Sequence, residues 1–289
     1  MQLNYANDSE LFGRCINLID EVFPGCKTFA STGMKYKASW SESSTPFVVE
    51  DKNNVIAHAG LWPITVMVNG AIHKTAAIHG VCVKPEYRGK GYFKQLMNEA
   101  MQVAAKNFES TILFTNKPYL YKDYPAYTAM LPEYDFLVKN KIAVCTDTDL
   151  RKLSLDNASD LNLLHQLLSN HMPVSDELSV LHANALFILN NLNNEIHYSD
   201  QLKTAIVYSI LNDTLYLKDI LCPKIGKISN IIELIPGQYE KIVFQFNPEK
   251  FLNENEYTPF MAAPECCVMV SETFPFKGKY FRYPETYAC

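Results

Sequence analysis

The stretch from Val83 to Met97, VKPEYRGKGYFKQLM, constrains the fold of this chain more than any other. The apolar residues from Ile78 to Val83 predict a strand, and those from Tyr92 to Ala104 keep the period of a helix that ends near Lys106. Two glycines and several basic residues stand between this strand and this helix. A strand, a glycine turn and a helix in this order place bare backbone N–H groups where phosphate oxygens can bind.

The elements before this stretch predict an antiparallel meander. Asp8 to Phe23 has helical spacing, and Pro24-Gly25 ends that helix before an irregular segment. Asn69-Gly70 is the strongest hairpin signal among the turns that follow. Apolar runs between turn residues predict strands at Pro46 to Glu50, Val55 to Val68, Ala71 to Val83 and Ser110 to Thr115. The first half therefore predicts an α/β fold of the α+β type, with a mixed sheet.

The second half repeats this pattern in a weaker form. A strand, Pro223, Gly226, a short helix and a strand before Asn247-Pro248 echo the first half, but the paired glycines and most basic residues are missing. We interpret the echo as a degenerate internal duplication, with domains at residues 1–142 and 150–289. Spacing predicts helices at Asn157 to His171, Asp176 to Leu192 and Gly226 to Leu234, and strands at Thr204 to Leu211, Leu215 to Leu221 and Lys241 to Phe246.

Composition narrows the class of protein. The chain has 289 residues, 48% of them hydrophobic, and a formal charge of -5, which argues against a nucleic-acid partner. Charged residues interrupt the first 25 positions, and no apolar run is long enough to span a bilayer, so we expect a cytoplasmic protein without a membrane partner. The eight cysteines form no C-x-x-C pair, and no metal site is expected.

Three ligand classes use a glycine turn before a helix, and two of them fit poorly. A P-loop requires glycine where Lys84 stands, and Ser or Thr where Gly91 stands. A Rossmann fingerprint would place its third glycine at Lys94, and the element before it is an antiparallel meander rather than a βαβ unit. The spacing thus excludes the first class and disfavours the second.

The third class fits the motif. Arg88-x-x-Gly91-x-Phe93, after Val81-x-Val83 and Pro85, resembles the pyrophosphate-binding motif of the GNAT N-acyltransferase superfamily, usually written Q/R-x-x-G-x-G/A. The resemblance covers about residues 1–140 in element order as well as in motif. It implies a GNAT fold followed by a second, degenerate GNAT-like domain. Phe93 departs from the pattern, because it occupies the usual small-residue position.

The same resemblance implies acetyl-CoA, or another acyl-CoA, as the co-substrate and no metal. The backbone of Val81, Cys82 and Val83 would pair with the pantetheine arm and supply an N–H donor to the thioester oxygen, a kind of contact worth roughly 3 to 4 kcal/mol in barrier. Cys82 itself is expected to point into the core. The pyrophosphate would be held by Arg88, Gly89, Lys90, Gly91, Tyr92 and Phe93.

Two further family positions find matches downstream. Asn116 corresponds to an asparagine that binds the pantetheine arm, and Tyr121 to a tyrosine that protonates the departing thiolate. Tyr119 and Tyr124 compete with Tyr121, since this chain has Pro125-Ala126-Tyr127 where the family commonly has Gly-Phe. The alternative interpretation is that these tyrosines belong to a helix that packs its aromatic side chains into the core and has no catalytic role. A proton from such a group contributes at most about 10² to 10⁴ in rate.

The sequence does not decide which residue acts as the general base. An amine acceptor arrives protonated and must lose a proton before it attacks the thioester. His79 lies on the same strand face as Val81, and the ordinary pKa of histidine suits the task. A hydrogen-bonded core histidine is the alternative interpretation. His58, Glu50, Asp123 and a chain of waters remain as other candidates.

The two-domain arrangement is similar to the first two domains of the enhanced-intracellular-survival type acetyltransferases. We therefore expect an N-acetyltransferase that moves an acetyl group directly from acetyl-CoA to a primary amine of a small molecule or peptide. The alternative is a non-catalytic acyl-CoA sensor or interaction module of the same fold. Phe93, at the usual small-residue position, also motivates a third hypothesis, the transfer of a longer acyl group. The acceptor, self-association as a homo-oligomer and the role of the second domain stay open.

Overall fold

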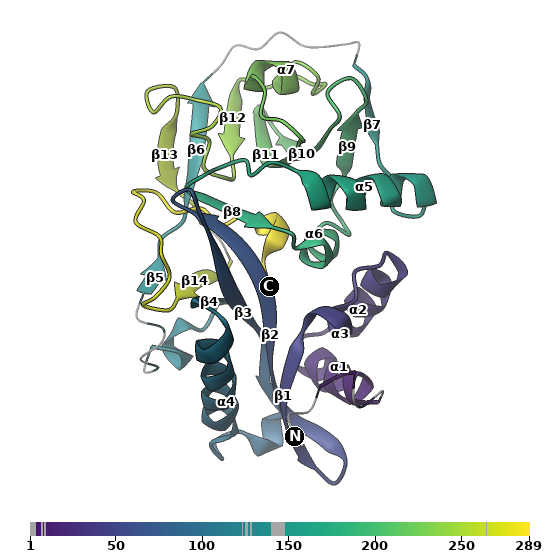
Figure 1. The fold of residues 1–289 in the computed structure, drawn as a ribbon, viewed down its shortest axis with the longest axis vertical. Coiled ribbons are helices and arrows are strands. Elements are labelled where there is room, and N and C mark those ends of the chain that lie inside the picture. The colour runs from purple at the N-terminus through teal and green to yellow at the C-terminus, as the bar shows by residue number, and fades with distance from the viewer. Residues whose placement is uncertain are drawn as a thin grey trace.

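Two seven-stranded sheets organise the structure, a computed structural model (Figure 1). It describes residues 4–6, 8, 10–122, 124, 127, 129–139, 148–263 and 265–289. Asp123, one of the candidate bases, and the junction between the two expected domains lie outside these residues. The division at residues 142 and 150 therefore stays a prediction.

The first sheet has the strand order β1-β2-β3-β4-β14-β5, and β8 pairs with one end of β2. Its strands are β1 (Thr45–Asp51), β2 (Asn54–Val68), β3 (Ala71–Val83), β4 (Ser110–Thr115), β5 (Ala129–Leu131), β8 (Leu178–Leu181) and β14 (Cys267–Val270). The expected hairpin is present, because Val68 pairs with Ala71 across Asn69-Gly70, and both turn residues have positive φ. Among the strand pairs that the structure describes in this sheet, only β3 and β4 run parallel.

Helices cover both faces of this sheet. On one face lie α1 (Leu11–Val22), α2 (Cys26–Lys35) and α3 (Trp40–Ser43), and on the other lies α4 (Tyr92–Asn107) (Figure 1). The apolar stripe of α1 buries Leu11 and Cys15 beside Trp62 of β2. The stripe of α4 buries Leu96 and Ala100 against the opposite face of the sheet. The helix expected after the glycines is thus confirmed, and α4 begins directly at them.

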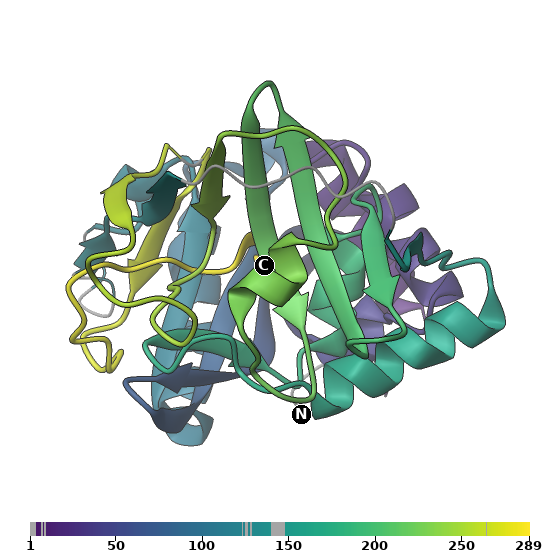
Figure 2. The same cartoon turned by 90° about the horizontal axis from the view of Figure 1, so that it is seen from above.

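The second sheet has the strand order β13-β6-β12-β11-β10-β9-β7. Its strands are β6 (Tyr134–Lys139), β7 (Leu150–Lys152), β9 (Ile196–Ser199), β10 (Thr204–Leu211), β11 (Thr214–Leu221), β12 (Lys241–Phe244) and β13 (Thr258–Met261). The helices of this unit are α5 (Ala158–Asn170), α6 (Asn184–Asn190) and α7 (Ile228–Ile232). Seen from above in Figure 2, α5 crosses this sheet on the side of the first unit, and α7 lies on the opposite side. Three short 3-10 helices complete the elements: η1 (Pro85–Tyr87), η2 (Pro118–Leu120) and η3 (Glu285–Tyr287).

The two sheets exchange a strand. β6 follows β5 along the chain but lies between β12 and β13 of the second sheet, whereas β14 follows β13 but lies between β4 and β5 of the first. The parallel pairs β3 with β4 and β11 with β12 occupy corresponding places in the two sheets. The repetition expected from the sequence is therefore present in the topology. The first sheet contains β8 and β14 from the second half of the chain, and the second sheet contains β6 from the first half.

A buried ion cluster ties the C-terminal segment after β14 to the place where the chain passes from the first sheet into the second. The guanidinium of Arg282, which is 1% exposed, lies 3.2 Å from Glu133 Oε1 and 2.8 Å from Asp135 Oδ1. Glu133 and Asp135 stand where the chain passes from β5 into β6. Burial raises the pKa of both carboxyl groups, and the Arg282 charge opposes that rise.

Two segments differ from the sequence expectation. Residues 26–35, expected to be irregular, form α2, whose Gly33 lies so close to Leu189 of α6 that a Cβ there would overlap it. Residues 176–192, expected to be one helix, form β8 and then α6, with His182 at positive φ between them. Pairing of β8 with β2 of the other unit overrides the local helical spacing.

Candidate functional site

β3 and β4 separate before the end of β3. They pair from Thr75 with Ser110 to Ile78 with Leu113, yet β3 continues to Val83. On its other side this last part of β3 stays bonded to β2, where Cys82 faces His58. Within the described residues, the backbone from Val81 to Val83 therefore has a strand partner on one side only. An extended ligand can pair with the open side in the manner of an added strand.

A β-bulge lies where the separation begins. His58 faces Cys82 and Gly60 faces His79, so β3 fits two residues, Gly80 and Val81, opposite one residue of β2. Gly80 has a φ of 57°, and its carbonyl accepts a hydrogen bond from His58 Nδ1 at 2.8 Å. Because the C=O and N–H of a trans peptide point in opposite directions, the N–H of Val81 points away from His58. Sequence reasoning missed this role of Gly80, although a glycine inside an apolar strand is a signal of a bulge.

The glycine loop joins β3 to α4 with its backbone exposed. Gly89 has a φ of 75° and Gly91 a φ of 86°, and a Cβ built at either position would meet nothing within 4 Å. Positive φ explains the two glycines, and the open space leaves room for a bound group. The first helical bond of α4 runs from Gln95 N–H to the Gly91 carbonyl, and no side chain in the described residues caps the helix. The N–H groups of its first turn are therefore available to an anion, and the helix dipole favours one.

Basic side chains flank this loop. Arg88 is exposed, and its Nε donates to the Val83 carbonyl at 3.1 Å, which fixes the guanidinium beside the end of β3. The Lys90 ammonium lies 4.7 Å from the centroid of the Tyr87 ring. Tyr87 in turn donates a hydrogen bond to Asp51 Oδ2 at 2.7 Å, so the 3-10 turn before the glycines is anchored to β1. The residues at the start of the loop are therefore held in place by hydrogen bonds. The glycine backbone after them is exposed and is flanked by positively charged side chains.

Tyr121 lies beside the start of α4. Its side chain is only 7% exposed, and the Phe93 ring packs against it edge-to-face at 5.4 Å. Burial, with the nearby Cys82 thiol, raises the pKa of the Tyr121 hydroxyl to about 12. Tyr119, by contrast, is 61% exposed, and the hydroxyl of Tyr124 donates weakly to the Lys94 carbonyl at 3.4 Å. Among the three tyrosines, Tyr121 is the one placed next to both β3 and α4.

Asn116 is exposed and follows the end of β4 directly. Its neighbour Thr115 pairs with Cys267 of β14, so a strand from the other half of the chain borders this position. The sequence did not reveal this contribution, because β14 is short and far along the chain. Asn116, the open edge of β3 and the glycine loop all lie at one end of the first sheet.

His79 is buried on the other face of the sheet. Its ring packs against Trp40 at 5.3 Å and Trp62 at 5.6 Å, and its Nε2 lies 2.7 Å from Ser44 Oγ. Burial, with the adjacent His58, lowers the pKa of His79 to about 3. Gly60 is glycine because the His79 ring lies against its Cα. The core histidine interpretation accounts for all of these contacts.

The other candidate bases that the structure describes are also engaged. His58 is buried, its Nδ1 donates to Gly80, and its Nε2 accepts from the Tyr5 hydroxyl at 3.3 Å. Burial lowers the pKa of His58 to about 4. Glu50 is exposed and forms an ion pair with Arg14 at 3.1 Å. Both histidines among these candidates therefore have lowered pKa values, and the Glu50 carboxylate is already paired.

Cys82 is placed as expected, with its side chain in the core. Burial raises the pKa of its thiol to about 12, so the thiolate needed for nucleophilic attack is disfavoured. Within the described residues, no group of three or more His, Cys, Asp or Glu side chains is arranged to hold a metal ion. Likewise, no described helix has the length and apolar character needed to cross a bilayer.

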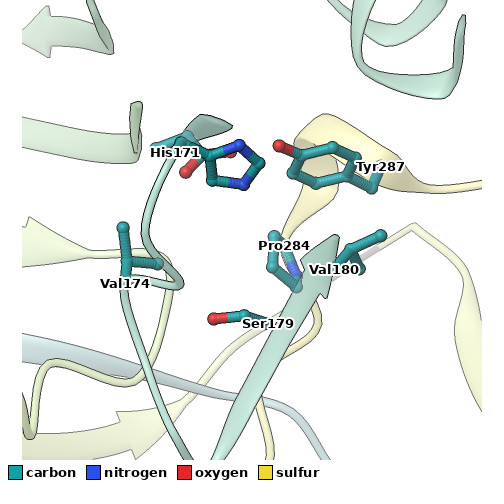
Figure 3. A pocket seen from close by; sticks show the side chains of 7 residues that line it. His171, Val174, Ser179, Val180, Pro284 and Tyr287 are labelled. Atoms are coloured by element: carbon teal, nitrogen blue, oxygen red, sulfur yellow. The ribbon is translucent and has the colours of Figure 1, made fainter. Parts of the chain in front are cut away.

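The matching part of the second unit is covered. β11 pairs with β12 only up to Leu217, but beyond that point Asp219 is buried and accepts a hydrogen bond from Thr286 of η3 at 2.7 Å. A cavity of only about 10 Å³ remains there, and Figure 3 shows the ring of His171 and the hydroxyl of Tyr287 facing each other across it. This volume holds at most one water, which leaves no room for a cofactor arm.

The comparisons with known proteins agree with this geometry. Residues 5–126 match the family model described as an acetyltransferase (GNAT) domain. No curated protein matches the chain by sequence. A protein from Enterococcus faecalis described as a probable N-acyltransferase has a similar structure, with a TM-score of 0.60 and 14% identity, over 91% of this chain and 70% of that one.

Two other solved structures are similar. Eis1 from Mycobacterium abscessus has a TM-score of 0.57 and 11% identity, over 90% of this chain and 71% of that one. A GCN5-related N-acetyltransferase from Kribbella flavida has a TM-score of 0.53 and 14% identity, over 93% and 69%. At these identities the likeness shows a shared fold. It extends over both halves of this chain, and the expected mixed α/β architecture of two related units is confirmed.

Proposed function

We propose, from the match of residues 5–126 to the acetyltransferase (GNAT) domain model, that the protein belongs to this family and transfers an acetyl group from acetyl-CoA to a primary amine. One observation carries the proposal furthest. The open edge of β3, from Val81 to Val83, leads directly into a glycine loop with uncapped N–H groups and free space. A chain that binds a diphosphate with an extended arm needs both features in this order.

In this proposal the backbone from Arg88 to Phe93 binds the pyrophosphate. Gly89 and Gly91 let the backbone approach the phosphate oxygens, and Arg88 and Lys90 add positive charge that salt screens. The open side of Val81 and Val83 pairs with the pantetheine arm, with Asn116 beside it. The Val81 N–H, turned away from His58 by the bulge, is the donor proposed for the thioester oxygen.

Tyr121 is proposed as the group that assists the leaving thiolate. Its hydroxyl keeps its proton at neutral pH, and Phe93 holds its ring between β3 and α4. Because a thiol leaves readily, we expect a modest effect at the low end of general-acid catalysis. Tyr121→Phe should lower kcat by about 10- to 100-fold and leave the Kd of acetyl-CoA within about twofold. Tyr119→Phe is the matched control, and an equal loss in that variant would move the acid to the exposed tyrosine.

His79 is the proposed proton acceptor, and its support is weaker than that of Tyr121. Because its low pKa means that it holds a proton poorly alone, we propose that it acts through Ser44, whose Oγ lies 2.7 Å from its Nε2. His79→Gln should lower kcat without changing the Kd of acetyl-CoA. An unchanged rate would return His79 to a purely structural role.

The same observations favour one alternative, a sensor that binds acyl-CoA without turnover. Its motivation is that the described candidate bases have lowered pKa values or are paired. The deciding experiment incubates the protein with acetyl-CoA and a panel of amines, amino acids, polyamines and aminoglycosides, and measures free thiol. Release of CoA with any amine supports the transferase. Tight acetyl-CoA binding without release for the whole panel would support the sensor instead.

Acyl chain length is tested in the same assay. Phe93 occupies the small-residue position of the motif and packs against Tyr121 and Tyr124, at the place where an acyl group would enter. These rings narrow the space, so we expect acetyl-CoA to be used better than longer acyl-CoAs. Faster turnover of a longer acyl-CoA would contradict this choice of co-substrate.

A further inference from the structure

The second unit contains a cavity that the proposed acyl transfer does not use. It has a volume of about 150 Å³ and lies just beyond the end of β12, next to β6 and β13. A cavity of this nominal size holds a benzene-sized molecule in another protein. Asn247 lines the cavity and is the counterpart of Asn116, because each is the third residue after the last parallel pair of its strand, Leu113 or Phe244.

The charge of this cavity is opposite to that of the glycine loop. Three glutamates line it, Glu177, Glu249 and Glu254, with Lys279 as the one cationic residue among the described lining residues. Burial raises the pKa of Glu249, and burial together with the Glu249 charge raises that of Glu177. A cation in the cavity would offset both costs, whereas a phosphate would add to them.

Two polar atoms at the cavity have no hydrogen-bond partner among the described residues. Asn247 is 2% exposed, and its side-chain carbonyl oxygen is unpaired while its Nδ2 donates to Glu177 Oε2 and to the Tyr280 carbonyl. Glu249 binds the Asp176 N–H through Oε1, but its Oε2 is unpaired. Both unpaired atoms are acceptors. The site therefore lacks a donor, which a ligand hydroxyl, a ligand N–H or a water could supply.

Three aromatic side chains, Phe136, Tyr257 and Tyr280, also line the cavity and are called its aromatic wall. Phe136 packs edge-to-face on Tyr257 at 5.4 Å and on Tyr280 at 6.3 Å, so the three rings hold one another in place. The Lys279 ammonium already lies 4.9 Å from the centroid of the Tyr280 ring. Carboxylates combined with aromatic faces are the chemistry that binds organic ammonium groups.

We propose that this cavity beyond β12 is a binding site for a small organic ammonium ion, held by the carboxylates of Glu177 and Glu249 and by the faces of the aromatic wall. A metal ion fits less well, because the three glutamates surround the cavity without converging into a metal-binding group within the described residues.

The site is remote from the proposed acyl transfer. The Asn69 N–H at the β2–β3 turn donates to the Glu177 carbonyl, and the glycine loop follows the far end of β3, about 40 Å away along that strand. The ligand is thus a second ligand and not the acyl acceptor. The inference stands on the second unit and does not depend on the proposed function.

The test uses the full chain without acyl-CoA and choline as the probe, with its neutral isostere 3,3-dimethylbutan-1-ol as the matched control. Calorimetry should detect choline binding and no binding of the isostere. Glu249→Gln should raise the Kd of choline at least tenfold, and Lys279→Gln should lower it by removing the competing ammonium. Glu272→Gln, an exposed glutamate outside the cavity, should change nothing.

Several outcomes would overturn the inference. Equal binding of choline and its isostere would show that charge is not recognised. Choline binding that survives Glu249→Gln would place the ligand elsewhere, and Mg²⁺ binding that displaces choline would make the site a metal site. If Glu249→Gln fails to fold, Glu254→Gln at the exposed side of the cavity replaces it, with at least a threefold rise in Kd expected and an unchanged Kd counting against the proposal.

Discussion

At the scale of residues, two buried histidines couple the stability of the first unit to pH. His79 and His58 have folded-state pKa values of about 3 and about 4, below the ordinary value near 6.5. A lowered folded pKa contributes stability that is fully present above the unfolded pKa. That stability is lost as pH falls toward the folded pKa, because the unfolded chain then binds protons that the native state excludes. The window therefore runs from about pH 6.5 down to about 4 for His58 and about 3 for His79.

His79→Gln should make the unfolding free energy less dependent on pH in this window. The expected change in slope is on the order of 1 kcal/mol per pH unit, because one titrating site is removed from the unfolded chain. Urea titrations between pH 7 and pH 4.5 measure it. Parallel slopes for wild type and His79→Gln would show that His79 is not excluded from protonation.

At the scale of elements, the strand, glycine loop and helix were predictable because their signals are local. Glycine is needed at positions 89 and 91 because the backbone has a positive φ there. The apolar spacing after these glycines predicted where α4 begins and, to within a residue, where it ends. Asn69-Gly70 marked the hairpin for the same reason. The functional side chains were less accessible to sequence reasoning, since burial of His79 depends on Trp40 and Trp62, which come from separate elements.

Elements defined by distant pairing could not be predicted in this way. The sequence of β8 follows a helical period, but four of its residues pair with β2. β14 has four residues and no local signal, and its place in the first sheet depends on β4 and β5. Short strands gain their stability from neighbours rather than from their own composition. For this reason β14, the strand that borders Asn116, could not be predicted from the sequence.

Gly91→Val tests the glycine loop as an anion site. Gly91 has a φ of 86°, which a β-branched residue adopts only at a cost, and the side chain would enter the space proposed for the phosphates. The Kd of acetyl-CoA, measured by calorimetry, should rise at least tenfold. Gly70→Val is the matched control, because Gly70 has a φ of 76° and equally open surroundings in the distant hairpin. Equal affinity in both variants would contradict the loop assignment.

Arg282→Met tests the buried ion cluster. The substitution leaves Glu133 and Asp135 buried without their cation, and the expected loss is about 3 to 5 kcal/mol in the free energy of unfolding. The loss should shrink on acidification, because both carboxyl groups have raised pKa values and become neutral first. Urea unfolding at two pH values measures both effects. Arg14→Met, at an exposed ion pair, should cost far less, and similar losses would argue against a special role of the buried cluster.

At the scale of the whole molecule, the exchange of β6 and β14 makes each sheet depend on the other half of the chain. Residues 1–142 expressed alone would lack β14, so β4 would keep β3 but lose its other neighbour, and β6 would have no sheet. We expect this fragment to show no cooperative thermal transition by circular dichroism. Adding residues 150–289 should restore one. A fragment 1–142 that folds and binds acetyl-CoA by itself would contradict this dependence.

The position of β14 also sets an order of events during synthesis. About 150 residues separate β4 from β14, which corresponds to roughly 8 to 30 s of elongation at 5–20 residues per second. Until then the nascent first sheet has an exposed edge, which is a site for unwanted pairing with other chains. A ribosome that stops before residue 270 therefore releases a chain whose first sheet still lacks the strand between β4 and β5.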